Sequence, residues 1–196
     1  MKNRMITALL GMVAIVAVNG CSGVGGGDGG DAYEKIAEIW DRDCQMVSEE
    51  RFVYETDTLL TDTLTCLEWQ YLPEAGYKSY VTPENFDKGR YDDTSGDTAQ
   101  STCEALGQGW RLPTKYEALS AIIKTDADLS KIPYRKEIPS ELYDRGNFFI
   151  GATWTSTPVS GHEEYRWFVE FLEDFAQTDS NRVDYASFQV FCVKEH

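Results

Sequence analysis

Histidine is scarce in this 196-residue chain, which contains only His162 and His196. A catalytic relay built on histidine, or a zinc site with several imidazole ligands, has almost no residues from which to form. Positive charge is also scarce, with 18 Lys and Arg against 33 Asp and Glu, a net charge of −15. Binding to a nucleic-acid backbone needs clustered Lys and Arg, so we expect no nucleic-acid partner.

The sequence also lacks the local motifs of common enzymes. It has no G-x-S-x-G nucleophile elbow and no C-x-x-C pair. Neighbouring carboxylates such as Glu163 and Glu164 point to opposite faces of a strand, which favours solvated surface over an acid–base pair. The acidic segment 92–97 has hard oxygens suited to Ca²⁺ but no closing glutamate, which favours a polar loop that caps the next helix. We therefore expect no catalytic site, no cofactor and no bound metal.

Residues 1–20 have the pattern of an export signal. Two positive residues precede an apolar run over residues 5–18, which is too short to span a bilayer comfortably and suits a secretory signal. The run ends in Val18-Asn19-Gly20-Cys21, which resembles the lipobox of bacterial lipoproteins. The resemblance implies that residues 1–20 are cleaved and that Cys21 carries the lipid. An ordinary signal peptide with a chance cysteine is the alternative.

A glycine-rich segment, residues 21–30, follows the cleavage position. Glycine at this density buries no surface, and no Lys-Ser or Lys-Thr follows as in a phosphate-binding loop, so we expect a flexible tether. Ser22, a residue other than Asp, favours the outer membrane by resemblance to other lipoproteins. Removal of Lys2 and Arg4 with the signal changes the net charge to −17. Such a surface repels anionic headgroups, so acyl chains must provide the attachment to the lipid bilayer.

Four further cysteines follow Cys21. An even number in an exported chain predicts two disulfides, and the wide spacing argues against a compact zinc motif. The count by itself leaves all three pairings open. The four residues are Cys44, Cys66, Cys103 and Cys192.

Helical and strand patterns alternate along the rest of the chain. Apolar residues recur at helical spacing over 31–43, within an N-terminal extension that we place at residues 31–49. A polar cluster at 94–97 predicts the start of a second helix, and the T-x-x-E capping box at 114–117 predicts the start of a third. Strands are predicted at residues 52–54, 59–61, 64–69, 167–172 and 188–192. This order predicts an α+β fold with an antiparallel sheet.

Several motifs in residues 50–196 resemble one bacterial secreted family, the Lcl C-terminal-like domain of the C-type lectin-like superfamily. They include Cys103-x₂-Leu106-Gly107, Trp110-Arg111-Leu112-Pro113-Thr114, Trp154-Thr155-Ser156-Thr157, Trp167-x-Val169-x-Phe171 and Phe191-Cys192-Val193. The resemblance implies a twisted antiparallel sheet with two short helices and long loops, and a Cys103–Cys192 disulfide. It departs at Cys66, where the family usually has glycine, and this cysteine is then expected to pair with Cys44.

The motif residues are expected to build the fold more than the function. Arg111 is suited to a carboxylate ligand, but a structural ion pair is favoured in so acidic a chain. Trp154 is suited to stacking on a sugar, but a core position is favoured. The residues to which we assign a structural role are Trp110, Arg111, Pro113, Thr114, Glu117, Trp154 and Trp167.

Binding residues are instead expected in two polar, turn-rich stretches, 71–97 and 158–166. Both carry aromatic residues, and tyrosine combines a flat apolar face with a hydroxyl and few rotatable bonds. The alternative is that these rings fold back and hold their own loops in place. The ligand-binding candidates are Tyr77, Tyr80, Tyr91 and Tyr165.

Two kinds of function fit these features. The first is a non-catalytic binding module, displayed on the cell envelope by its lipid, that recognises a glycan, a peptide or a protein partner in the manner of an adhesin. The second is a structural or assembly lipoprotein of an envelope complex with no small ligand. Both place the chain on a bacterial membrane after export, with the outer membrane favoured.

The lipid anchor is tested by the substitution Cys21→Ser. We expect the variant to leave the membrane fraction or to accumulate as uncleaved precursor, because it lacks the thiol that receives the lipid. Membrane fractionation and intact-protein mass spectrometry measure both results. A mature wild-type chain that begins at Cys21 and carries no acyl mass would contradict the prediction.

Overall fold

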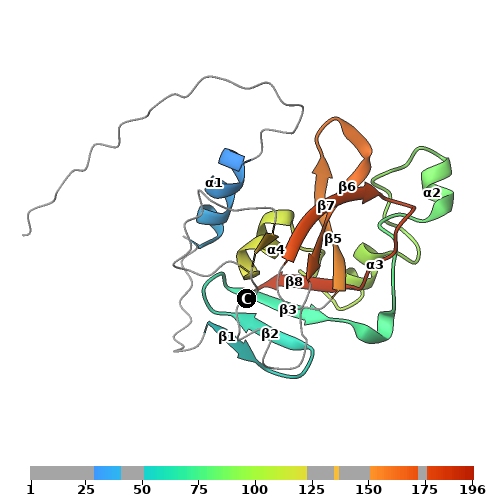
Figure 1. Cartoon of the computed structure of the whole chain (residues 1–196). Helices are drawn as coiled ribbons and strands as arrows, with labels where there is room; N and C mark the ends of the chain where they lie inside the picture. Colours follow the sequence, from blue (N-terminus) through green and yellow to red (C-terminus); the bar gives the residue numbers. More distant parts are fainter. Residues whose placement is uncertain (1–28, 41–50, 123–134, 137–150, 172–175) are drawn as a thin grey trace, which may run out of the picture.

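The structure is a computed structural model that describes residues 29–40, 51–122, 135–136, 151–171 and 176–196 (Figure 1). These residues form a mixed α+β fold with antiparallel sheets, which confirms the predicted class. The expectation of one sheet is wrong, because the strands form two. The signal peptide, residues 21–28 of the tether and Cys44 lie outside the described residues, whereas Gly29 and Gly30, predicted as tether, are already part of the first helix. In the described ranges, no helix is long and apolar enough to cross a membrane.

The first sheet has the strand order β1-β2-β3-β8, so the last strand of the chain pairs with the third. Its inner face is apolar, and Leu60, Leu67 and Trp69 have no exposed surface. Ile36 of α1 (Gly29–Trp40) packs into the same cluster, so the N-terminal helix contributes to this core. The strands are β1 (Phe52–Tyr54), β2 (Leu59–Asp62), β3 (Leu67–Tyr71) and β8 (Phe191–Glu195).

The second sheet consists of three main strands with a two-residue strand at its edge, in the order β4-β7-β6-β5. Its two longest strands form a hairpin that contains the predicted strand at Trp167. A single bridge between Thr153 and Gln189 links this sheet to the chain just before β8. The strands are β4 (Arg135–Lys136), β5 (Gly151–Val159), β6 (His162–Phe171) and β7 (Ala176–Arg182).

Three short helices and one 3₁₀ turn, Pro73–Ala75, complete the described fold after α1. The capping box predicted at Thr114 is confirmed: its hydroxyl accepts from the Glu117 N–H at 3.1 Å, and Glu117 accepts from the Thr114 N–H at 2.8 Å. Figure 1 shows α4 beside α1, and the two helices pack together. The helices are α2 (Pro83–Asp87), α3 (Ala99–Glu104) and α4 (Lys115–Ile122).

A second apolar cluster lies around Trp154 and the disulfide between Cys103 and Cys192. The pairing of these two cysteines confirms the pair that the family resemblance implied. Closing a loop of 89 residues removes about 4–5 kcal/mol of conformational freedom from the unfolded chain on the chain-entropy model. Cys66 is also disulfide-bonded. Its pairing with Cys44 remains a prediction.

Several predicted boundaries differ from the observed ones. The strand expected at 64–69 begins only at Leu67, because Cys66 has a φ of 55° and ends a turn. The helix expected from 94–97 begins at Ala99, because the Thr98 side chain accepts the Ser101 N–H and caps it there. No sequence pattern predicted α2, β5 or β7.

The segment that begins with Arg111 connects both sheets. The Arg111 backbone exchanges two hydrogen bonds with Val193 of β8, at 3.0 and 2.8 Å. The Pro113 carbonyl accepts the Ser156 N–H of β5 at 2.8 Å. The Arg111 guanidinium forms two 2.7 Å hydrogen bonds with the Glu117 carboxylate, so the predicted structural ion pair is present.

The charge of Glu117 is stabilised although its side chain is only 2% exposed. Burial raises the pKa of Glu117, but hydrogen bonding and charge from Arg111, together with the Thr114 N–H and hydroxyl, lower it more. The pKa therefore lies below the ordinary glutamate value. A carboxyl whose folded pKa is depressed adds stability above its unfolded pKa and loses that stability as the pH falls.

Glu117→Gln is expected to lower the free energy of unfolding at pH 7 by about 2 kcal/mol, because it leaves the half-buried Arg111 without its charge partner. The difference from wild type should shrink as the pH falls below the ordinary glutamate pKa, because the unfolded wild-type chain then takes up a proton that the folded carboxyl accepts only at lower pH. Urea unfolding at a series of pH values measures this. Glu195→Gln, at an exposed carboxylate 4.0 Å from Arg111, is the control and should change stability by less than about 0.5 kcal/mol. A difference that stays constant down to pH 3 would contradict the assigned charge.

Candidate functional site

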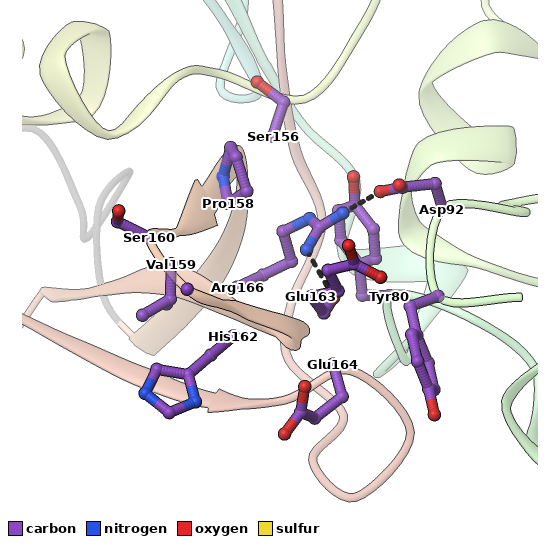
Figure 2. A pocket seen from close by; sticks show the side chains of 12 residues that line it. Tyr80, Asp92, Ser156, Pro158, Val159, Ser160, His162, Glu163, Glu164 and Arg166 are labelled. Carbon is purple, nitrogen blue, oxygen red and sulfur yellow. Dashed lines mark hydrogen bonds and ion pairs between the residues drawn. The ribbon is translucent and has the colours of Figure 1, made fainter. Parts of the chain in front are cut away.

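An open cavity of about 670 Å³ lies where the free end of the β5–β6 hairpin meets the segments around Tyr80 and Asp92 (Figure 2). Its volume is within the range of small-molecule sites. Most of the side chains around it are polar. The lining residues are Tyr80, Tyr91, Asp92, Ser156, Pro158, Val159, Ser160, Gly161, His162, Glu163, Glu164 and Arg166.

The β5–β6 hairpin forms one wall of the cavity. Local features of its turn and of its strand pairing set its shape. Gly161 has a φ of 77°, a conformation that side-chain-bearing residues rarely adopt, and it allows the chain to reverse between Val159 and His162. The pairing of β5 with β6 is irregular around Pro158, which has no N–H to donate to a ladder. The segment 158–166, expected as an irregular loop, is therefore mostly strand.

Arg166 is the central side chain of the cavity, and the residue is only 3% exposed. One terminal nitrogen, Nη1, donates to the carbonyls of Glu163 and Tyr165, both at 2.9 Å. The other, Nη2, donates to the Asp92 carboxylate, as the dashed lines of Figure 2 show. The guanidinium carbon lies 4.9 Å from the centre of the Tyr80 ring. The Nε–H has no hydrogen-bond partner among the described residues, so this buried group has one unused donor.

Asp92 reaches Arg166 from an ordered turn. Asn85 of α2 donates to the Asp93 carbonyl at 2.8 Å, and the Asp93 carboxylate accepts from the Ser95 N–H and hydroxyl. The hydrogen bonds from Ser95 lower the pKa of Asp93. The Asp92 side chain itself is 82% exposed. The Asp92–Arg166 pair therefore joins an exposed carboxylate to a buried cation across 74 residues of sequence.

Two further carboxylates stand at the rim. Glu163 is exposed and Glu164 is half-buried, and neither carboxylate forms an ion pair or hydrogen bond within the described ranges. In Figure 2 Glu163 lies beside Arg166, and Glu164 extends farther from it. The exposed His162 packs edge-on with the Tyr165 ring, with ring centres 5.8 Å apart. The rim is thus acidic and open to solvent.

The structure places the four predicted tyrosines in different settings. Tyr80 and Tyr91 line the cavity, whereas Tyr77 and Tyr165 do not. Tyr80 is only 7% exposed and packs edge-on against Trp154, and Tyr91 packs on Phe86 with ring centres 5.2 Å apart. Tyr77 is 69% exposed. For Tyr80 and Tyr91, the contacts match the alternative in which the rings hold their own loops in place.

The three tryptophans that were assigned structural roles pack within the fold. Trp154 is fully buried and donates its ring N–H to the Lys78 carbonyl at 3.1 Å. The ammonium groups of Lys194 and Lys115 lie over the rings of Trp110 and Trp167, at 5.0 and 4.0 Å from the ring centres. None of the three lines the cavity.

The residues that sequence reasoning missed are Arg166 and its partner Asp92. Both lie in the stretches 71–97 and 158–166, but no pattern singled them out, because strand alternation puts Arg166 on the face of Phe168 and not on that of the buried Val169. Among the described residues, no group of three His, Cys, Asp or Glu side chains is arranged to hold a metal ion. The chain matches no family model, no curated protein and no solved structure.

Alanine substitutions are expected to separate the tyrosines. Tyr80→Ala should lower the free energy of unfolding by about 3 kcal/mol, because it empties a buried ring position beside Trp154 and uncovers Arg166. Tyr77→Ala, at an exposed ring, should change stability by less than about 0.5 kcal/mol. Thermal and urea unfolding measure both variants. Equal losses of stability in the two variants would contradict the difference in burial between Tyr80 and Tyr77.

Proposed function

We propose that the protein is a non-catalytic binding module, attached to the bacterial envelope by a lipid on Cys21, that recognises a glycan, peptide or protein partner in its cavity. The observation that carries this proposal is the open, polar cavity on the β5–β6 hairpin, with the buried Arg166 held by Asp92 and by two backbone carbonyls. Sites that recognise ligands combine a preformed hollow with a few fixed polar groups.

The arrangement of the polar groups supports recognition rather than chemistry. In the described part of the chain, no carboxylate or hydroxyl hydrogen-bonds the His162 ring, so no activated nucleophile is assembled there. Arg166 is committed to Asp92 and to two carbonyls, which suits a fixed binding surface. A general acid requires a dry, enclosed pocket. Glu163 is instead exposed and Glu164 is only half-buried, at a rim that is open to solvent.

A C-type lectin-like fold of the Lcl C-terminal-like kind is the finer part of the proposal. Three observations support it. Arg111 and Glu117 of the family motif pair at the junction of the two sheets, and Trp154 occupies the second apolar cluster. Cys66, where the family usually has glycine, has the positive φ that glycine adopts most readily.

The binding function is tested with the full chain purified in detergent and applied to arrays of glycans and peptides. Ser160→Trp fills the cavity mouth from an exposed turn, so we expect ligand capture to fall at least about tenfold without loss of stability. Asp57→Trp introduces the same side chain at an exposed bend between β1 and β2 and is the control. We expect Asp57→Trp to bind as the wild type does.

Two results would count against the cavity. Equal capture by Ser160→Trp and wild type would place recognition elsewhere on the surface. Absence of capture on every array, together with one stable envelope complex found by crosslinking in intact cells, would favour the structural or assembly lipoprotein instead.

A further inference from the structure

The charge arrangement of the cavity narrows the ligand class, on the assumption that the proposed binding function holds. We propose that the cavity takes an uncharged, hydroxyl-rich ligand, a neutral sugar residue of a glycan. The juxtaposition that supports this is a buried, compensated guanidinium beside carboxylates that remain free to accept hydrogen bonds.

Anionic ligands are disfavoured because the described part of the lining has no available cation. Arg166 is the one Lys or Arg among these lining residues, and its charge is already compensated by Asp92. An acidic ligand would have to displace Asp92 and then lie beside Glu163 and Glu164 as well. The net charge of −15 over the whole chain adds to this repulsion.

Cationic ligands are disfavoured because Arg166 would repel them. An ammonium or guanidinium group would pair with Glu163, but it would lie close to the fixed positive charge of Arg166. Among the described lining residues, Tyr80 has the one buried aromatic ring, and that ring is already covered by Arg166.

A hydroxyl group can pair with both the hydrogen-bond acceptors and the hydrogen-bond donors of the cavity lining. It donates one hydrogen bond and accepts up to two, so neighbouring hydroxyls on a sugar ring can donate to Asp92 or Glu163 while accepting from the Ser160 hydroxyl. Ser160 lies on the exposed turn of the hairpin, where its hydroxyl can both donate and accept. Carboxylates that accept from neutral hydroxyls form charge-assisted bonds, which gives affinity without a charged ligand.

The test presents the full chain in detergent with an array of neutral, sulfated, uronic-acid and unacetylated amino-sugar oligosaccharides. We expect capture of neutral members only. Titration of the best-bound member should give the same affinity at about 50 mM and about 500 mM salt, because no charge pair forms between protein and ligand. Capture restricted to charged members, with affinity that falls with salt, would overturn this inference and leave the binding function intact.

The substitution Glu163→Gln tests the proposal at a single residue. Its carboxylate forms no hydrogen bond or ion pair within the described chain, so the variant should keep the wild-type melting temperature. It should weaken the neutral ligand by about tenfold, since one charge-assisted hydrogen bond becomes a neutral one. Glu55→Gln, the same change at an exposed turn in the first sheet, is the matched control and should bind as wild type.

The two proposals fail in different ways. Stronger binding by Glu163→Gln, or unchanged binding of a neutral ligand, would refute the assigned role of the carboxylate. Insensitivity of all capture to Ser160→Trp would refute the cavity itself, and with it the proposed function.

Discussion

The Arg111–Glu117 ion pair is the interaction on which the two-sheet arrangement depends. It orients the short segment whose backbone pairs with β8 on one side and with β5 on the other. The same carboxylate caps α4, which packs against α1. The connections to β8, to β5 and to α4 therefore all depend on one nearly buried carboxylate, that of Glu117. Loss of its charge would loosen a junction of helix and sheets and would not merely remove a surface contact.

The polar groups of the cavity are held in place by contacts within the protein. Arg166 is held by two carbonyls of its own strand and by a carboxylate from a separate turn, with an aromatic ring beneath it. Asn85 and Ser95 fix that turn in their own right. The binding that we propose would therefore cost little conformational freedom.

Features that depend on neighbours in sequence could be predicted, and those that depend on distant neighbours could not. The capping box at Thr114 and the strand at Phe52–Tyr54 follow from residues within one turn or one alternation. β7 reads A-Q-T-D-S-N-R, a polar composition that becomes a strand only because it pairs along β6. The Asp92–Arg166 contact spans 74 residues, so neither residue carried a local sign of it, whereas the tyrosines drew attention by their chemistry alone.

The position of β8 has a consequence for the order of folding. The first sheet needs β8 beside β3, and Cys103 must wait for a cysteine 89 residues further along the chain. A chain that is synthesised from its N-terminus therefore exposes Leu67 and Trp69 of β3, and the free thiol of Cys103, until β8 arrives. During that interval β3 presents an unpaired strand edge, and Cys103 is open to exchange with other thiols. An extension inserted ahead of β8 would lengthen this vulnerable period.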